Sequence, residues 1–461
     1  MAASALGVWM NGVAVGTWVL PRRGGATSFE YEPSWVASAA ARALSLSLPI
    51  TSAGVIRGPE VDHYFDNLLP DSIDIRRRLG RRFGTRSTSA HDLLSAIGRD
   101  CVGAVQLLPE GETPERQMRI EAGKLSESEV ERHLRSVTSA DFVAGQSPDA
   151  DFRISIAGAQ EKTALLRIGD HWFLPHGATP TTHILKLPLG LVGNMRADMS
   201  LSVENEWLCA QLLAAFGLPT ARTDMESFGG RRVLVVRRFD RRWQGVDDAK
   251  SQEAGFRPPA SAWIARLPQE DFCQALGLPS RLKYQSDGGP GSDDILRVLA
   301  HGEHAPADRL NFVRAQFAFW LLAATDGHAK NFSIAHRRGG AFGLTPLYDV
   351  ISAWPIIGTG ATQVAYQRAR LAMALRGKSP HYRLGEIRAR HWADLAASAG
   401  APEAVSALDD MAGQAGEVLR RVEGLLPACF PASVWSKVGR GVIRHAQQYL
   451  RERAASVSAA A

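Results

Sequence analysis

The sequence contains few cysteines and no long hydrophobic run. Only four cysteines occur among 461 residues, far apart and without a C-x-x-C pair. This spacing argues against a zinc site and against the disulfide framework of a secreted protein, so a reducing cytoplasm fits best. No apolar stretch approaches the roughly 18 residues that span a bilayer, and residues 1–7 lack the basic and apolar parts of a signal peptide. We therefore expect a soluble, cytoplasmic protein with no membrane partner.

The composition is that of a globular protein. Hydrophobic residues make up 45% of the chain and charged residues 22%, inside the usual range for folded domains. The length suggests two to three domains or one large bilobal domain. The net charge of +6 favours an acidic partner such as nucleic acid or a nucleotide.

Turn signals and apolar periodicity divide the first third of the chain. Asn11-Gly12 lies between two apolar runs and predicts a β-hairpin, because this dipeptide supplies the positive backbone angles of a type I′ turn. Residues 33–44 and 126–137 have helical periodicity. The polar, small-residue stretch 138–151 is the best domain boundary.

The remainder of the chain begins with short apolar strands and a helix at residues 204–216, and becomes mainly helical from residue 271. Val313, Phe317 and Trp320 recur at helical spacing and predict a buried amphipathic helix. That helix delivers the chain into a polar segment beginning at Ala324.

This polar segment contains Asp326 and Asn331 with four residues between them, and a second aspartate follows at Asp349. The set is typical of phosphoryl-transfer sites in kinases. We predict that Asp326 is the general base that deprotonates a substrate hydroxyl. Asn331 and Asp349 offer the hard oxygen ligands that Mg²⁺ prefers.

Three neighbours of this set are candidates for supporting roles. Lys330 is placed to stabilise charge on the transferred phosphoryl group. His328 either contacts phosphate or packs under the loop as a structural histidine. Tyr348 is better suited to be a wall of the site than a catalyst.

Upstream, residues 155–162 predict a phosphate-binding loop. Small residues around Gly158 let backbone N–H groups approach phosphate oxygens, although an ordinary β-turn would have the same composition. Lys186 ends an apolar run, as does the kinase lysine that neutralises phosphate oxygens. Glu206 is favoured over Glu204 as its partner, and a solvated helix start is the alternative for both glutamates.

Residues 235–240 are expected to form the crossing between two lobes. Backbone N–H and C=O groups there would form hydrogen bonds with the edge of the adenine base, while Phe239 packs on its ring. The alternative is an ordinary strand end without a ligand. The Asp240 carboxylate would accept a hydrogen bond from a ribose hydroxyl or form an ion pair with Arg241. Two basic runs, at residues 76–82 and 368–390, suit either phosphate-backbone contact or a solvated face.

The motifs together resemble the HipA family of serine/threonine kinase toxins and are similar to its founding enterobacterial type. The segments that carry the resemblance are residues 65–71, 97–100, 155–166, 180–183, 266–271, 286–291, 324–333 and 344–346. The resemblance spans nearly the whole chain and these motifs are highly specific, so chance is not a serious competitor.

The resemblance implies an α+β, protein-kinase-like bilobal fold that uses ATP and Mg²⁺. It implies an N-terminal β-rich subdomain at residues 1–148, an ATP-binding lobe at 149–265, an all-helical catalytic lobe at 266–453 and a flexible tail at 454–461. Asp326 would be the catalytic base and Ser155 the autophosphorylation site. The residues implied to hold ATP and metal are Ala157, Gly158, Ala159, Gln160, Glu161, Lys162, Lys186, Arg237, Arg238, Phe239, His328, Ala329, Lys330, Asn331, Tyr348 and Asp349.

The resemblance also implies partners. The expected substrate is an aminoacyl-tRNA synthetase, glutamyl-tRNA synthetase in the founding type, whose phosphorylation stalls translation and favours dormancy. A small helix-turn-helix antitoxin of the HipB type is expected to bind the chain, and the pair to repress its own operon on operator DNA.

Two departures from the family pattern bear on these expectations. Arg237 stands where an acidic residue is expected, and the segment 244–261 is longer than expected. Two other functions stay open: a catalytically idle corepressor that binds antitoxin and DNA, and a small-molecule phosphotransferase of the aminoglycoside type. Intact Lys186, Asp326, Asn331 and Asp349 speak against the first, and the Ser155 loop with the N-terminal subdomain disfavours the second.

Overall fold

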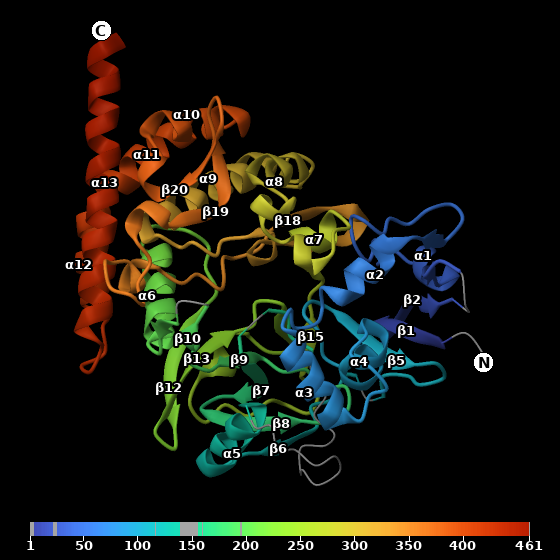
Figure 1. Ribbon diagram of the computed structural model, residues 1–461. Helices are drawn as coiled ribbons and strands as arrows, with labels where there is room; N and C mark the ends of the chain where they lie inside the picture. The colour runs from blue at the N-terminus through green and yellow to red at the C-terminus, as the bar shows by residue number, and fades with distance from the viewer. Residues whose placement is uncertain are drawn as a thin grey trace. The chain divides into compact units, whose positions relative to one another are not determined.

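The computed structural model describes residues 4–21, 25–115, 117–138, 155–158, 160–193 and 196–460. The chain forms two compact units (Figure 1). The first unit comprises Met1–Leu187, Glu226–Arg281 and Ile334–Phe342, and the second comprises Pro188–Met225, Leu282–Ser333 and Gly343–Ala461. The predicted α+β class is confirmed, since both helices and several sheets are present. The domain boundary predicted at residues 148 and 149 lies outside the described residues, and the three-domain division stays a prediction.

The first unit opens with a five-stranded antiparallel sheet of order β4-β3-β2-β1-β5. The predicted hairpin is confirmed, with Asn11 at φ 49° and Gly12 at φ 83° in its turn. Trp18 and Phe65 stack in the core beneath the sheet, with ring centroids 4.1 Å apart. The elements of this part are β1 (Ser4–Met10), β2 (Val13–Leu20), β3 (Ser28–Tyr31), α1 (Pro33–Val36), β4 (Val55–Arg57), α2 (Pro59–Asp66), α3 (Ile73–Phe83), α4 (Ala90–Ile97) and β5 (Val105–Pro109).

The helix predicted for residues 33–44 is wrong beyond Val36. Helix α1 ends there, and polar groups from elsewhere satisfy the backbone that follows. The Leu44 N–H donates to the Tyr31 hydroxyl at 2.7 Å, and Trp35 Nε1 donates to the Arg42 carbonyl at 3.0 Å. These tertiary hydrogen bonds replace the helical ones that periodicity predicts.

A six-stranded sheet follows, of order β12-β13-β9-β7-β8-β6. Its strands are β6 (Ala122–Lys124), β7 (Lys162–Ile168), β8 (His171–Pro175), β9 (His183–Lys186), β12 (Thr223–Phe228) and β13 (Arg231–Arg237). Helix α5 (Glu127–Thr138), predicted from residues 126–137, packs Val130 and Leu134 into the core with Leu165 and Val235 of the sheet (Figure 1).

Short strands and short helices make up the remaining elements. They are β10 (Gly190–Val192), β11 (Ala197–Met199), β14 (Arg241–Gln244), η1 (Lys250–Gln252), β15 (Trp263–Arg266), β16 (Gln269–Asp271), α7 (Phe272–Ala275), η2 (Ser280–Leu282), η3 (Gln285–Asp287), η4 (Ala329–Asn331), β17 (Ser333–His336), η5 (Arg338–Gly340), β18 (Phe342–Leu344), η6 (Trp354–Ile356), η7 (Tyr366–Arg368) and η8 (Leu384–Glu386).

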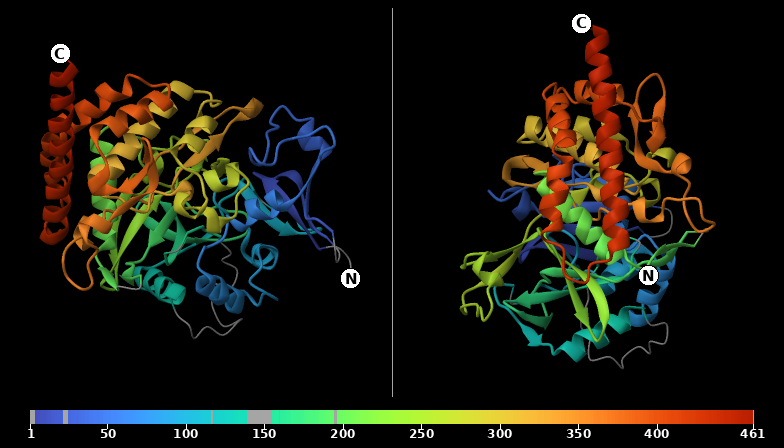
Figure 2. Two further views of the ribbon diagram at one scale, coloured as in Figure 1. Left: turned by 45° about the horizontal axis from the view of Figure 1, so that its top comes forward. Right: turned by 90° about the vertical axis from the view of Figure 1, so that its left-hand side faces the viewer.

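The second unit is mainly helical. Its helices are α6 (Ser202–Ala215), α8 (Ser292–Leu299), α9 (Ala305–Leu322), α10 (Ala389–Ser398), α11 (Ala404–Gly413), α12 (Ala415–Glu423) and α13 (Ala432–Ala460). The antiparallel pairs β10–β11 and β19 (Arg370–Arg376) with β20 (Pro380–Arg383) also lie in this unit. The all-helical lobe predicted for residues 266–453 is wrong, because strands β16 to β20 lie in that range. Val313, Phe317 and Trp320 of α9 are buried as the periodicity predicts. Helix α13 lies beside α9 and α11 and extends past them at its C-terminal end (Figure 2). It continues to Ala460, through the residues for which the sequence predicts a flexible tail.

Among the described residues, no helix combines the length and apolarity that crossing a membrane requires. Cys101, Cys209 and Cys273 are buried free thiols, and Cys429 is exposed.

Candidate active site

The catalytic segment predicted from the sequence begins where helix α9 ends. Ala323 caps this helix in the left-handed conformation at φ 48°, and its N–H donates to the Trp320 carbonyl at 3.0 Å. The Ala324 N–H then donates to the Phe319 carbonyl at 2.7 Å. This tight stop turns the chain out of a buried helix and into the segment that carries Asp326.

Asn331 brings the three predicted catalytic residues together within the second unit. Its Nδ2 donates to the Asp326 carbonyl at 2.9 Å and to the Asp349 carbonyl at 3.3 Å. The Asp349 backbone has φ 60°, a conformation that aspartate tolerates better than most residues and that clusters at functional sites. The Asn331 amide therefore joins the backbones of Asp326 and Asp349, while the chemical role of each residue stays a prediction.

The chain after Asp349 is tied to two helices. The amide of Asn205, in α6, exchanges two hydrogen bonds with the Ser352 backbone, at 2.8 and 2.9 Å. The Ser352 hydroxyl donates to the Leu322 carbonyl in α9 at 2.5 Å. The segment that carries Asp349 is thus held by rigid elements, which is what a precise site requires.

The three supporting candidates differ in exposure. His328 and Lys330 are buried, and the Tyr348 side chain is partly buried. Tyr348 donates to the Lys330 carbonyl at 2.9 Å and lies 2.5 Å from the Ser333 hydroxyl. Its hydroxyl therefore braces the catalytic segment, in agreement with the role of a wall.

The donor set fits a magnesium ion. Because Asn331 uses its amide hydrogens on two backbone carbonyls, its Oδ1 is fixed as an acceptor beside the Asp349 segment. Among the described residues, no group of three or more His, Cys, Asp or Glu could hold a metal. A site built from one amide oxygen and one carboxylate suits Mg²⁺, which keeps phosphate and water as its other ligands.

Tyr284 also belongs to this site, although it is not among the residues predicted from the sequence. Its hydroxyl donates to Oδ1 of Asp326 at 2.5 Å, and its ring meets the His328 ring edge-on with centroids 4.9 Å apart. It precedes the glycine-rich segment 286–291 by two residues, and that motif was the one available pointer to it.

In the first unit, three of the segments predicted to bind nucleotide lie on neighbouring strands. Lys162 of β7 pairs with Lys186 of β9, and His183 at the other end of β9 pairs with Arg237 of β13. The Leu187 N–H donates to the Glu161 carbonyl at 3.1 Å, which joins the end of the predicted phosphate loop to the lysine strand. Ala159 lies outside the described residues.

The predicted phosphate loop is held by the N-terminal part of the same unit. Ser155 is buried, its N–H donates to the Asp100 carbonyl at 3.1 Å, and its hydroxyl donates to the Leu68 carbonyl at 2.7 Å. Gly158 has φ 111°, and a Cβ there would lie 2.5 Å from Nζ of Lys162. Only glycine lets this lysine fold over the loop.

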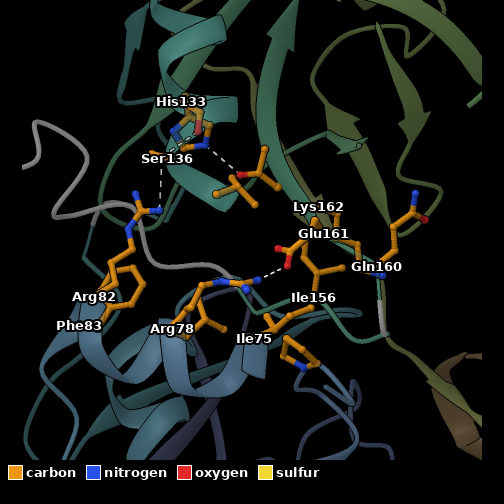
Figure 3. A pocket seen from close by; sticks show the side chains of 14 residues that line it. Ile75, Arg78, Arg82, Phe83, His133, Ser136, Ile156, Gln160, Glu161 and Lys162 are labelled. Carbon is orange, nitrogen blue, oxygen red and sulfur yellow. Dashed lines mark hydrogen bonds and ion pairs between the residues drawn. The ribbon is translucent and has the colours of Figure 1, made fainter. Parts of the chain in front are cut away.

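A pocket lies beside this loop, lined by α3, α5 and β7 (Figure 3). Arg78 of α3 forms an ion pair with Glu161, and Arg82 donates to the Ser136 hydroxyl at 3.5 Å. His133 and Thr163 share a hydrogen bond of 2.9 Å. Glu161 and Gln160, whose Nε2 donates to the Leu187 carbonyl at 2.5 Å, therefore have structural contacts of their own.

Three arginines of the first basic run have carboxylate partners. Arg76 pairs with Asp66 at 2.5 Å and Arg77 with Asp74 at 3.1 Å. With Arg78 also paired, three of its arginines are neutralised by carboxylates of the same unit. Nucleic-acid contact by this run has no support in these contacts.

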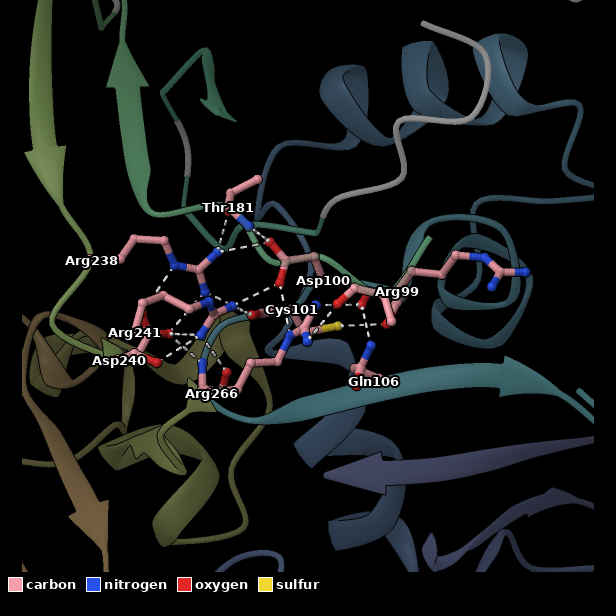
Figure 4. Close-up of polar contacts among 12 residues, drawn as sticks. Arg99, Asp100, Cys101, Gln106, Thr181, Arg238, Asp240, Arg241 and Arg266 are labelled. Atoms are coloured by element: carbon pink, nitrogen blue, oxygen red, sulfur yellow. Dashed lines mark hydrogen bonds and ion pairs between the residues drawn. The ribbon is translucent and has the colours of Figure 1, made fainter. Parts of the chain in front are cut away.

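Arg238 belongs to a buried ion cluster (Figure 4). Its guanidinium donates to Asp240 at 2.9 and 3.0 Å and to Asp100 at 3.3 Å, and its backbone N–H donates to the Thr182 carbonyl at 2.9 Å. The N–H and guanidinium groups of Arg238 are thus engaged within the protein. The predicted nucleotide contact cannot use them in this arrangement.

The same cluster decides between the two roles predicted for Asp240. Its carboxylate accepts from Arg238 and from the Gly103 N–H at 2.7 Å, and it pairs with Arg241 at 3.1 Å. Burial raises its pKa, but the Arg238 and Arg241 guanidiniums outweigh burial and lower the pKa of Asp240 to about 2. Pairing with Arg241 is therefore what the structure shows, in place of a ribose contact.

Arg237, the two candidate glutamates and Lys186 all have defined positions in the structure. The Arg237 side chain forms an ion pair with Asp248, in the segment 244–261 that is longer than expected. Glu204 and Glu206 are both buried in α6, so the solvated helix start is wrong. Lys186 is buried in the first unit, and its pairing with Glu206 stays a prediction.

The second basic run forms the β19–β20 hairpin and the turns around it. Arg376 pairs with Asp293 at 2.8 Å, Arg383 with Glu386 at 2.9 Å and Arg388 with Glu452 at 3.7 Å. The other basic residues of the run are exposed, namely Arg368, Arg370, Lys378 and Arg390. This leaves a partly neutralised cationic face on the second unit.

Comparison with known proteins identifies the family. The family model described as the HipA N-terminal domain matches residues 6–108, and that described as the HipA-like C-terminal domain matches residues 154–419. Y4mE of Sinorhizobium fredii is 34% identical over 410 residues, which cover 87% of each chain. The serine/threonine-protein kinase toxin HipA of Shewanella oneidensis is 26% identical over 321 residues, 67% of this chain and 66% of that protein.

A solved structure has the same fold. It is the Shewanella oneidensis HipA complex with HipB and operator DNA, whose matching chain is 22% identical, with a TM-score of 0.76 over 97% of each chain. The predicted kinase-like fold is therefore confirmed. By its two matching domain models and by its similarity to Y4mE over most of its length, this chain belongs to the HipA family.

Proposed function

We propose that this chain is the toxin of a toxin-antitoxin module, a serine/threonine protein kinase that uses ATP and Mg²⁺ in the cytoplasm. The observation that carries the proposal is the convergence of Asp326, Asn331 and Asp349 through the Asn331 amide. Membership of the HipA family supports it, since one relative is named as a toxin kinase of this specificity.

Each residue has a defined task in the proposed reaction. Asp326 accepts the proton of the attacking serine hydroxyl, and its exposed carboxylate is open to a protein substrate. Asn331 and Asp349 hold Mg²⁺, which when bound neutralises charge on the phosphates. Lys330 stabilises charge on the transferred group.

The nucleotide is assigned to the first unit. Backbone N–H groups of residues 157–162, with Lys162 folded over Gly158, bind phosphate oxygens. Lys186, at the end of β9, neutralises a phosphate. Backbone groups around Arg237 and Phe239 contact the adenine edge.

Ser155 is the proposed autophosphorylation site and acts as an off-switch. Its hydroxyl is buried against the Leu68 carbonyl, so phosphorylation requires the serine to leave this position. A phosphate there carries nearly two negative charges and cannot return to a carbonyl oxygen. The N–H groups of the loop would then no longer be arranged for ATP.

Incubation of the full chain with ATP and Mg²⁺ tests this function. Peptide mass spectrometry should find phosphate on Ser155, and Asp326→Asn should lower its incorporation at least about 100-fold because the base is lost. Equal labelling of the variant would show that Asp326 is not the base. Phosphoproteomics after brief expression, comparing wild type with Asp326→Asn, should reveal a serine of glutamyl-tRNA synthetase as the cellular target.

The proposed partners are an antitoxin of the HipB type and operator DNA. The Shewanella oneidensis HipA complex contains both, and the exposed cations around Lys378 offer a surface for phosphates. If the toxin touches DNA, Lys378→Glu should weaken operator binding by the toxin-antitoxin complex and reduce the salt slope by about one. An unchanged slope would restrict DNA contact to the antitoxin.

The two alternatives predict different outcomes in the same assays. An idle corepressor would bind antitoxin and DNA without phosphoryl transfer, and the convergent Asp326 site argues against it. A small-molecule phosphotransferase would consume ATP only with a metabolite acceptor. A metabolite screen that finds such an acceptor, with no labelled protein, would favour the latter.

A further inference from the structure

The glycine-rich segment 286–291 has no task in the proposed reaction, yet it builds a rigid turn beside the site. The Asp287 and Gly289 N–H groups both donate to the Tyr284 carbonyl, at 3.1 and 3.0 Å. Gly288 has φ 91°, and a Cβ on Gly289 would lie 1.8 Å from the Leu282 carbonyl oxygen and 2.8 Å from that of Tyr284. Any side chain at Gly289 would therefore push this turn open.

The turn is attached on both sides of Tyr284. The Ala329 N–H, within the catalytic segment, donates to the Lys283 carbonyl at 3.2 Å. On the other side, the Ala374 N–H of β19 donates to Oε1 of Gln285 at 2.7 Å. These hydrogen bonds fix the backbone of Tyr284 relative to the catalytic segment.

The side chain of Tyr284 is fixed as well, and it ends on the carboxylate of Asp326. Its ring meets the His328 ring at 83° with centroids 4.9 Å apart, and its hydroxyl donates to Asp326 Oδ1 at 2.5 Å. Within the described part of the chain, Oδ2 of Asp326 receives no hydrogen bond. The tyrosine thus holds one carboxylate oxygen and leaves the other for a substrate hydroxyl.

We propose that Tyr284 is a positioning residue for Asp326, an inference that rests on the proposed kinase function. Without the tyrosine hydroxyl, the exposed Asp326 side chain would rotate among its rotamers and spend less time with Oδ2 directed at the substrate. Because misplacement by about 1 Å costs about 100-fold in rate, loss of this single hydrogen bond should appear in kcat.

The alternative role for the same contact is that of a plug, in which the Tyr284 hydroxyl occupies the place of the substrate hydroxyl. A plug must move away for catalysis. The anchored backbone and the packed ring argue for a fixed support instead. The two roles predict opposite changes in rate.

Tyr284→Phe is the test, because it removes the hydroxyl and keeps the ring against His328. The initial rate of phosphate incorporation into the full chain is measured by intact mass at varied ATP, and its maximal rate constant and half-saturating ATP concentration are taken as kcat and KM. We expect kcat to fall about 10- to 100-fold while KM for ATP stays unchanged. A variant with wild-type kcat, or with a raised one as a plug predicts, would overturn the inference.

Tyr449→Phe is the matched control. Tyr449 also donates to an aspartate, Oδ1 of Asp409 at 2.8 Å, but it braces helix α13. Its loss should lower the melting temperature and leave kcat unchanged. If the control lowers kcat as much as Tyr284→Phe does, the effect is structural and the positioning role is wrong.

Two further variants separate positioning from other causes. Added to Asp326→Asn, Tyr284→Phe should cause no additional loss of rate, because a positioning residue acts only through the base. Gly289→Ala, which displaces the turn, should lower kcat as Tyr284→Phe does. Additive losses in the double variant would overturn the inference. A wild-type chain that transfers no phosphate would overturn the proposed function as well, which distinguishes the two failures.

Discussion

At the scale of single residues, the side-chain amide of Asn331 has two tasks in the candidate site. Its N–H groups hold two segments of the chain together, and its oxygen is a proposed metal ligand. Its two amide hydrogens reach the carbonyl of Asp326, five positions before it in the chain, and that of Asp349, 18 positions after it. A carboxylate of nearly the same shape offers oxygens but no hydrogens. Asparagine is therefore required here for the geometry of the site and also as a ligand.

Asn331→Asp tests that requirement. The substitution keeps a ligand oxygen and places a negative charge against two carbonyl oxygens, so the two segments should separate. We expect phosphoryl transfer to fall at least about 100-fold and the melting temperature to drop. Asn311→Asp, on α9, is the control and should change neither quantity by a comparable amount, since Asn311 contacts Arg314. Full activity of Asn331→Asp would show that the amide hydrogens are dispensable.

At the scale of elements, helix α13 is joined to α9 by a buried histidine. His445 is stacked on the Trp320 ring with centroids 4.2 Å apart, its Nδ1 lies 2.6 Å from the Trp320 carbonyl, and its Nε2 lies 2.8 Å from the Tyr366 hydroxyl. This arrangement suits the neutral ring, with Nδ1 as donor and Nε2 as acceptor. Burial, reinforced by the nearby Arg444 charge, lowers the pKa of His445 to about 3 although the Trp320 carbonyl raises it.

The pH dependence of stability should report this histidine. An unfolded histidine takes up a proton near pH 6.5, while folded His445 does not until about pH 3, so stability is lost as the pH falls between these values. The expected slope is about 1.4 kcal/mol per pH unit. The free energy of unfolding in urea, measured between pH 6.5 and 4, should depend on pH less steeply in His445→Gln than in the wild type, by that amount. This difference in slope does not depend on the absolute stability of the variant. A slope unchanged in His445→Gln would contradict the assignment.

At the scale of the whole molecule, the first unit is joined internally by charges from distant parts of the sequence. Asp100 accepts from Arg241 at 2.9 Å, from Arg266 at 3.1 Å and from Thr181 at 2.6 Å (Figure 4). Burial raises the pKa of Asp100, but the surrounding guanidiniums outweigh it and hold the pKa well below its usual range. The N-terminal sheet region and the six-stranded sheet region therefore share one buried ion cluster.

The contribution of this ion cluster to stability should be measurable both by lowering the pH and by substituting Asp100. Since the pKa values of Asp100 and Asp240 are lowered, their stabilisation is present above about pH 4 and is lost as the pH falls toward 2. Asp100→Asn should destabilise the chain by about 3–5 kcal/mol, because it leaves buried guanidiniums short of a partner. The urea midpoint at pH 7 measures this effect. Asp74→Asn, in an exposed pair with Arg77, should cost less than about 1 kcal/mol, and an equal loss in both variants would count against the cluster.

Local signals in the sequence predicted much of the fold because their causes are local. The Asn11-Gly12 turn depends on the backbone preferences of two residues, and α9 depends on apolar spacing within a few turns. The kinase set was predictable for a similar reason, since Asp326 and Asn331 lie on one short segment. The chemistry of hard oxygen ligands then pointed to Asp349.

The structure alone decided how the same residues are used over long distances. Asn11 forms the predicted turn, and its amide also exchanges two hydrogen bonds of 2.8 Å with the Arg266 backbone, 255 positions away. Arg238 was predicted at a nucleotide crossing, and its side chain pairs with buried carboxylates, one of them in a distant segment. Tyr284 reaches Asp326 across 42 positions. The sequence by itself determined many of the elements, the family and the chemical inventory. Only tertiary packing determined which polar group meets which, because a buried donor must find its acceptor wherever the folded chain brings one.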